Sequence, residues 1–206
     1  MAGRDVRPQR TGRRDGHGRD AVIAAALRAF WRSGFHGASI RDIAEEADMT
    51  AASLYHHFSN KQDILRSILV LTLQDVLAVT RVAVLRSGGS PAGQLSALTA
   101  AWVEFHAEHR VPALVSAAEM RYLDAADRSV VVALRDEQEL MFRQVVEHGV
   151  ETGAFGTPDP HHATRAIINM GTAVSSWFRP DGSLTVGEVG LVYARLALAL
   201  VEARRA

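Results

Sequence analysis

The feature that most constrains the fold is residues 39–61, SIRDIAEEADMTAASLYHHFSNK, because this stretch carries closely spaced helix-start signals. Ser39 is followed three residues later by Asp42, a pairing typical of a helix N-terminus: the hydroxyl accepts from an early backbone N–H, and the carboxylate favours the positive end of the helix. Thr50 is placed to cap a second helix, which leaves residues 48–49 for the turn. The stretch therefore predicts two short helices joined by a tight turn.

Two short helices that cross at such a turn form a helix-turn-helix, whose second helix fits the major groove of DNA. The outward positions of that second helix are small or polar, so its backbone can approach base edges. An ordinary helix pair in an all-helical domain is the alternative, because this spacing also arises by chance. We expect Tyr55, His57 and Lys61 to donate to phosphates and so position the protein on DNA rather than specify the sequence. The complete predicted DNA-binding set is Ser39, Arg41, Thr50, Ala51, Ser53, Tyr55, His56, His57 and Lys61.

The N-terminal segment is basic, although the formal net charge of the chain is +0. Residues 1–19 contain six arginines and two aspartates, a local sum of 6 minus 2, or +4. We predict that residues 1–18 form a disordered basic tail, which either reaches phosphates or a minor groove, or is a solubilising or start-site segment without a role in binding. Residues 19–63 are assigned to the helix-turn-helix domain, whose first helix carries an apolar stripe and ends at Gly34.

Residues 64–206 are expected to form a second helical domain. A long helix should run from about residue 61 to residue 85, and the stretch SGGSP at 87–91 is the clearest break after it. Capping residues and the helical spacing of apolar side chains predict further helices at 91–109, 111–122, 124–152, 159–178 and from 185 onward. No strand pattern competes with them. The predicted fold class is all-α, with about nine helices divided between a three-helix N-terminal domain and a larger C-terminal domain.

Composition excludes several classes of protein. With 48% apolar residues the chain is not intrinsically disordered, and without cysteine it has neither disulfides nor thiolate metal sites. No apolar run reaches the roughly 18–20 residues of a membrane span, and no signal peptide is evident. We therefore expect a soluble, cytoplasmic protein with no membrane partner.

The histidine pairs do not predict a metal site. His106 and His109 can share one helix face, but nothing in the sequence marks the third and fourth ligands that a zinc site needs. His161 and His162 are adjacent and point to different sides. Phosphate-binding loops and nucleophile motifs are missing as well. We expect no enzymatic activity and no cofactor.

The segment from about residue 22 to residue 65 resembles the DNA-binding domain of the tetracycline-repressor (TetR) family. The resemblance rests on F-x-x-x-G-F at 30–35, S-I-R-D-I-A at 39–44 and S-L-Y-H-H-F-x-N-K at 53–61. The family often has glycine where this chain has Asp48 in the turn and Ala52 in the recognition helix, which puts in doubt that the same bases are read. The resemblance implies a ligand-responsive transcriptional regulator, most often a repressor, in which the long helix links the DNA-binding domain to a domain for effector binding and dimerisation.

In this family the last two helices form a four-helix interface with a second copy, and a two-fold dimer suits a palindromic operator in double-stranded DNA. The corresponding predicted helices carry small residues among large ones, which permits close helix approach. Ordinary packing within one chain is the alternative for these residues. A helical enzyme or small-molecule carrier with an incidental helix-turn-helix is the alternative for the whole protein.

The helices predicted between residues 91 and 178 are rich in aromatic residues and methionine, so a cavity among them would be largely apolar and would suit a small lipophilic effector. Simple filling of the core is the alternative. The stretch W-F-R-P-D-G at 177–182 resembles a branch of the family that responds to fatty-acyl or steroid-derived coenzyme A thioesters. This resemblance implies that Trp177 faces an acyl chain or adenine and Arg179 a phosphate, although Arg179 also fits a solvated helix-end cation. The predicted pocket residues are Trp102, Phe105, His106, Glu119, Met120, Met141, Phe142, Asn169, Trp177 and Arg179.

Overall fold

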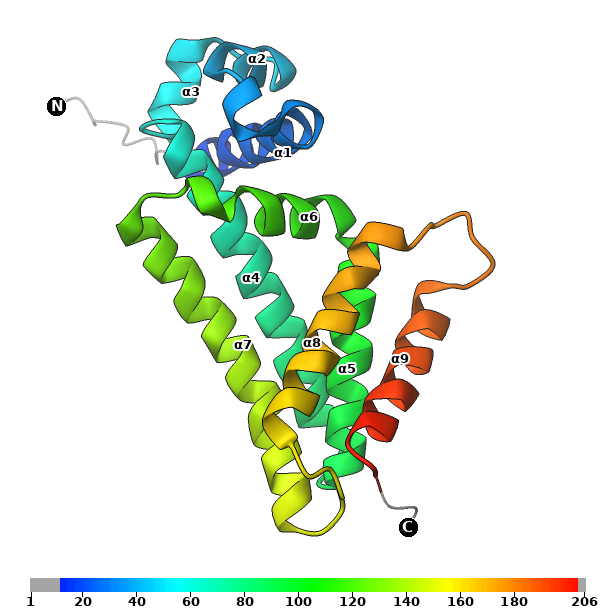
Figure 1. Ribbon diagram of the computed structural model, residues 1–206. Helices are drawn as coiled ribbons and strands as arrows, with labels where there is room; N and C mark the ends of the chain where they lie inside the picture. Colours follow the sequence, from blue (N-terminus) through cyan, green and yellow to red (C-terminus); the bar gives the residue numbers. More distant parts are fainter. Residues whose placement is uncertain (1–11, 204–206) are drawn as a thin grey trace, which may run out of the picture. The chain divides into compact units, whose positions relative to one another are not determined.

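The computed structural model describes residues 12–203, and within this range the chain forms nine α-helices, one 3-10 turn and no strand (Figure 1). The predicted all-α fold class is confirmed. Contacts divide the chain into two compact units between Ile68 and Leu69, whereas the sequence placed the boundary between residues 63 and 64. The division falls inside helix α4 (Lys61–Arg86), so this helix contributes residues to both units.

Unit 1 contains α1 (Gly12–Gly37), α2 (Ile40–Glu46), α3 (Ala51–His57) and the start of α4. Helix α1 begins earlier than predicted, so residues 12–18 of the expected disordered tail are helical; their three glycines, which disfavour helix, are the reason the sequence indicated otherwise. Residues 1–11 of that tail lie outside the described residues. The regular helix breaks as predicted at Gly34, whose φ of 69° and ψ of 170° are not helical.

The predicted caps of the two short helices are confirmed. The hydroxyl of Ser39 accepts from the backbone N–H of Asp42 at 3.1 Å, and the Asp42 carboxylate accepts from the N–H of Ser39 at 2.9 Å. Thr50 Oγ1 accepts from the N–H of Ser53 at 3.1 Å. Apolar side chains from all four helices form the core of this unit: Val22, Ala26, Phe30, Ile43, Ala44, Leu54, Phe58, Ile64 and Leu65.

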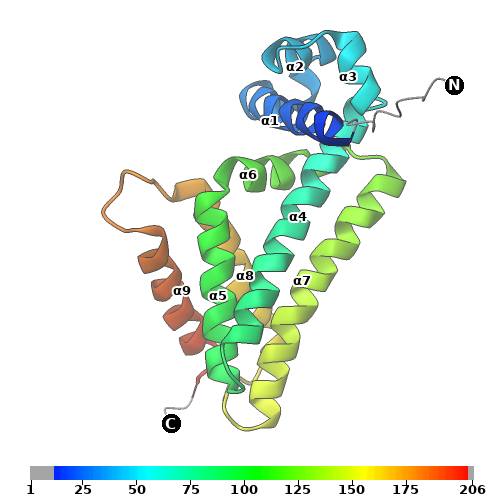
Figure 2. The ribbon, with the colours of Figure 1, turned by 180° about the vertical axis from the view of Figure 1, so that it is seen from behind.

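Unit 2 is organised around α5 (Pro91–Glu108), which contacts α7 (Ala125–Glu151), α8 (Pro160–Trp177) and α9 (Val186–Leu200). Both ribbon views show α8 and α9 running beside α5 (Figures 1 and 2). The short helix α6 (Arg110–Glu119) and a 3-10 turn, η1 (Met120–Tyr122), connect α5 to α7. Asp124, Asp159 and Thr185 cap α7, α8 and α9 as the sequence predicted.

Helix α4 departs from the expectation that no apolar stretch of the chain is long enough to span a membrane. By length and apolar content it meets the criterion for a membrane span, a test that the core helix of a soluble protein also passes. The helix is rich in apolar residues because many of them are buried in the cores of the two units: Ile64, Leu65, Ile68, Leu69, Leu73, Val76 and Leu77.

Close approach of α8 to α5 generates a prediction at Gly171. A methyl group there would overlap Cδ1 of Trp102, whose indole N–H is held by the carbonyl of Ile168 at 3.1 Å. We expect Gly171→Ala to lower the free energy of unfolding by roughly 1–3 kcal/mol, despite the better helix propensity of alanine. Thermal unfolding of the full chain measures this. Gly187→Ala on α9, where no atom lies within 4 Å of the added methyl, is the matched control and should not destabilise; equal stability of the two variants would contradict the argument.

Candidate nucleic-acid interface and ligand cavity

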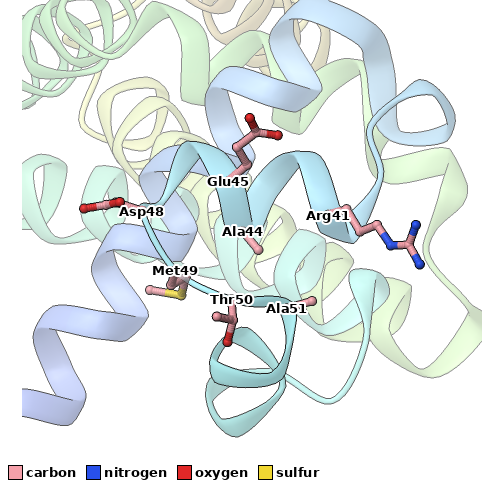
Figure 3. Close-up of a pocket in the computed structure, with 7 residues that line it drawn as sticks. All are labelled: Arg41, Ala44, Glu45, Asp48, Met49, Thr50 and Ala51. Carbon is pink, nitrogen blue, oxygen red and sulfur yellow. The ribbon is translucent and has the colours of Figure 1, made fainter.

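The turn between α2 and α3 depends on one left-handed residue. Asp48 has a φ of 55°, which aspartate tolerates better than most side chains because it is short and polar. Around the turn, the side chains of Arg41, Thr50 and five neighbours line an open hollow (Figure 3). Figure 3 shows Arg41 extending away from one end of α2 and Asp48 from the other.

The outer face of α3 presents most of the predicted DNA-binding residues to solvent. Leu54 is fully buried, whereas Tyr55 is 54% exposed. His56 is exposed as well, and Ser53 and His57 are half-buried. The structure therefore brings one apolar residue inward and leaves polar groups and a phenol on the opposite face. Such a face supplies donors and acceptors for base edges and phosphates.

The remaining predicted contacts fall at helix N-termini. The hydroxyls of Ser39 and Thr50 accept capping bonds, but each keeps its proton for an outside acceptor. Arg41 is exposed on α2, and Ala51 is half-buried in the first turn of α3. All eight members of the predicted set other than Lys61 thus lie wholly or partly at the surface of the same domain.

Lys61 lies in a different environment from the other predicted DNA-binding residues. Its Nζ donates to the carbonyl of Phe35 at 2.6 Å and to that of Ala38 at 2.8 Å, and it lies 4.4 Å from the centre of the Phe35 ring. Burial lowers the pKa of Lys61. Two of its three donors are therefore used inside the domain, where they satisfy carbonyls at the end of α1. Lys61 is the only lysine in the sequence, and a compact ammonium fits between two carbonyls where a planar guanidinium would not.

Two further cations on α1 are paired with one carboxylate on α2. Glu46 accepts from Arg32 Nη2 at 2.7 Å and from Arg28 Nε at 2.6 Å, and these bonds lower the pKa of Glu46 to about 2. All three groups lie near the surface, so the pairs tie α1 to α2 rather than fill the core. The positive charge of α1 is partly neutralised by this arrangement.

Unit 2 contains a cavity of about 360 Å³ among α4, α5, α6, α7 and α8. Four predicted pocket residues, Trp102, Phe105, His106 and Asn169, line it. Most of the lining side chains are buried, and its exposed members, Ala117, Arg135 and Asn169, mark the opening. The cavity has the size and the mostly apolar wall of a small-molecule site.

The other six predicted pocket residues do not line this cavity. Phe142 is fully buried and meets the Trp102 ring edge-on at 5.8 Å, behind the wall. Met141 packs against the same core cluster, and Glu119 and Met120 lie at the end of α6.

Trp177 and Arg179 mark the point at which the chain leaves α8, and the following segment extends outward before α9 (Figure 1). Trp177 is 46% exposed and stacks on Tyr193, while Arg179 is bound to Asp181 at 3.1 Å. The sequence indicated which helices are aromatic, whereas the tertiary structure decides which helix faces line this cavity.

Several polar residues that line the cavity were not predicted from the sequence, above all Ser116, Arg135 and Gln138. A signal was available for Gln138. It lies seven residues after Val131 and four before Phe142, in the stripe of α7 that is buried. A polar residue at such a core-facing position marks either a buried hydrogen-bond network or a site.

His106 sits in the cavity wall as a neutral ring. Its Nδ1 lies 2.7 Å from the carbonyl of Trp102, so this nitrogen carries the proton and Nε2 is left as an acceptor. The ring also contacts the Trp102 indole, with 4.2 Å between centroids. Burial lowers the pKa of His106 to about 4. Within the described residues no group of three or more possible ligands could hold a metal ion.

The Lys61 interactions predict a structural role. Lys61→Met leaves two carbonyls unpaired and should lower the free energy of unfolding of unit 1 by roughly 1–3 kcal/mol. Hydrogen exchange of residues 35–65 in the full chain, measured by mass spectrometry, reports this locally. Lys61→Arg should destabilise as well, whereas a phosphate contact would be preserved by arginine. A different result would assign Lys61 to DNA: Lys61→Met leaves hydrogen exchange unchanged and reduces the slope of log affinity for DNA against log salt concentration by about one unit.

The neutral state of His106 predicts a pH dependence of stability. Because its folded pKa is about 4 against an ordinary value of 6.5, the unfolded chain takes up the proton first, and stability present above pH 6.5 is lost as the pH falls toward 4. At pH 5 this loss is about 2 kcal/mol relative to pH 7. Thermal unfolding at both pH values should show it in the unmodified chain and in the control His161→Gln, but much less in His106→Gln. Equal pH dependence in all three proteins would contradict the assignment.

Comparison with known proteins finds one family for both parts of the chain. The model of bacterial regulatory proteins of the tetR family matches residues 22–68, and that of the tetracyclin repressor-like C-terminal domain matches residues 88–201. The HTH-type transcriptional repressor KstR2 of Rhodococcus jostii is 29% identical over 182 residues, which cover 87% of this chain and 89% of that protein.

Solved structures show the same fold. A tetR-family regulatory protein from Rhodococcus RHA1 has a TM-score of 0.85 at 26% identity, over 91% of this chain and 98% of that one. The ketosteroid transcriptional regulator KstR2 of Mycobacterium tuberculosis has a TM-score of 0.81 at 26% identity, over 98% of this chain and 100% of that one. With its two domain models matched in order and its helices arranged as in these structures, the chain belongs to the tetR family of bacterial regulatory proteins.

Proposed function

We propose that the protein is a transcriptional repressor that binds a palindromic operator as a homodimer and leaves it when a small lipophilic effector enters the cavity of unit 2. The main support for this proposal is that a single helix, α4, adjoins the helix-turn-helix and also forms part of the cavity wall. Helix α4 begins directly after the helix-turn-helix and contributes Thr72, Leu73 and Val76 to the cavity wall. A ligand that favours one placement of α4 would change the spacing of the two recognition helices by population shift.

The relatives support a repressor with an apolar effector. The KstR2 proteins are named transcriptional repressors, and the one from Mycobacterium tuberculosis is described as a ketosteroid regulator. A ring system of that kind suits a wall made by Trp102, Phe105 and Ile168. A cytoplasmic location follows from the proposal.

A coenzyme A thioester would need a different placement from the one the sequence suggested. Trp177 and Arg179 do not line the cavity, and Arg179 is paired with Asp181. The cavity could take at most the acyl portion of such a molecule, so a lipophilic body is the part of the effector that the lining supports.

Exposed apolar side chains on α8 and α9 support the homodimer. Trp177 is 46% exposed at the end of α8, and Leu191, Leu196 and Leu200 on α9 are 60%, 47% and 43% exposed. Small residues such as Ala166 and Ala173 lie on α8 among larger ones and are also exposed. A second copy covering this face would remove apolar surface from water.

A mobility-shift assay on DNA flanking the encoding gene tests the proposal. We expect a two-fold symmetric site to be bound more tightly than scrambled DNA, and lipophilic compounds to release it. His56→Ala should lower affinity for the site by roughly 1–3 kcal/mol with little effect on scrambled DNA. His148→Ala, an exposed histidine on α7, is the control and should change neither. Equal binding to site and scrambled DNA would favour a carrier or enzyme instead.

A further inference from the structure

Two buried polar side chains line the cavity without a complete set of hydrogen bonds. Ser116 on α6 is 5% exposed, and its Oγ has no partner among the described residues. Gln138 on α7 is 2% exposed, and its Nε2 is likewise unpaired there. An unpaired buried group of this kind is destabilising, and a bound polar group that completes its hydrogen bonds would offset that cost.

The Gln138 amide lies beside Thr80 on α4. Its Oε1 is 3.1 Å from Thr80 Oγ1, which has a single proton to donate and also lies 2.7 Å from the Val76 carbonyl. With Oε1 toward Thr80, both N–H donors of Nε2 are available to the cavity. Turning the amide by half a revolution would present Oε1 instead. An anion in the cavity would select the orientation with the donors inward.

Arg135 brings a cation to the same part of the wall. Its Nη2 donates to the backbone carbonyl of Ser116 over a long distance of 3.4 Å, which places the guanidinium beside that serine. Arg135 as a whole residue is exposed at the opening, yet the protein atoms around its guanidinium desolvate it and lower its pKa. Glu139 lines the cavity one turn further along α7, but among the described residues no ion pair joins it to Arg135.

The rest of the wall is suited to an apolar molecule. Leu73, Val76, Trp102, Phe105 and Ile168 contribute aliphatic and aromatic surface. The cavity therefore combines an apolar body with one polar end that is rich in donors.

We propose that the effector is an apolar monocarboxylic acid whose carboxylate binds the guanidinium of Arg135 and accepts further hydrogen bonds from Ser116 Oγ and Gln138 Nε2. This inference rests on the proposed function, because it assigns the effector of the same cavity. Among the described lining residues Arg135 is the one lysine or arginine, Glu139 is the one acidic residue and His106 is neutral, so the wall offers a single cationic partner, enough for one carboxylate. A polyphosphate would need several cations.

The test compares molecules that share one apolar body and differ in the head group. The probes are saturated fatty acids of increasing chain length and a fused-ring carboxylic acid, each with its methyl ester. Trp31→Phe and Trp177→Phe leave Trp102, in the cavity wall, as the only tryptophan, so quenching of its fluorescence reports binding there. We expect at least one acid to bind about tenfold or more tightly than its ester, as for a charge-assisted hydrogen bond.

Arg135→Gln should lower the affinity for that acid about tenfold and leave the affinity for the ester within about twofold. Arg143→Gln, at a half-buried arginine two turns further along α7 that does not line the cavity, should change neither. No preference for any acid over its ester, or an equal loss for acid and ester in Arg135→Gln, would overturn the inference.

Ser116→Ala separates a binding role from a structural one. Because the hydroxyl has no hydrogen-bond partner among the described residues, its removal should leave the melting temperature unchanged or raise it, yet weaken acid binding severalfold. A lower melting temperature with unchanged acid affinity would contradict the assignment. The mobility-shift assay tests the carboxylate site and the proposed function separately. If esters release DNA as well as acids do, the carboxylate site is overturned and the proposed function stands. If acids bind selectively but the protein binds no operator, the proposed function alone is overturned.

Discussion

Packing in unit 2 depends on the indole of Trp102. Its N–H donates to the carbonyl of Ile168 on α8, its face contacts His106, and the ring of Phe142 from α7 meets it edge-on. The absence of a side chain at Gly171 lets α8 come close enough for this bond. One residue on α5 thus fixes the distances to two neighbouring helices. Because the same ring forms part of the cavity wall, the shape of the cavity is set by the core and not by a mobile loop.

Two polar groups of the cavity wall are buried without a complete set of hydrogen bonds. Most buried polar groups in proteins are hydrogen-bonded, and here Thr80 and Trp102 follow that rule. Ser116 and Gln138, which line the cavity, depart from it, and so does Thr99, which lies in the core outside the cavity. His106 adds an uncharged acceptor to the same wall. Buried polar groups without hydrogen-bond partners are expected at functional sites, because a core selected for stability alone would have apolar side chains at those positions.

The helix-turn-helix consists of very short helices that depend on the rest of unit 1 for their stability. Helices α2 and α3 have seven residues each, too few to be stable alone, so their ends must be held by other groups. Ser39 and Thr50 cap their N-termini, Glu46 is paired with two arginines of α1, and Leu54 is buried. Lys61 serves the same domain by satisfying carbonyls at the end of α1. With these groups engaged inside, the outer face of α3 is left to a partner.

The sequence by itself determined the all-α fold, the caps of α2, α3, α7, α8 and α9, the break at Gly34 and the family. These features are local: a cap needs a hydroxyl or carboxylate beside a free backbone N–H, and an apolar stripe needs only its own helical period. The tertiary structure alone decided that Lys61 points inward, that Trp177 and Arg179 lie outside the cavity, and that Ser116, Arg135 and Gln138 meet in its wall. Those facts depend on which helix faces oppose one another. That pairing is fixed by close contacts such as Gly171 against Trp102, between residues far apart in the chain, which no local pattern encodes.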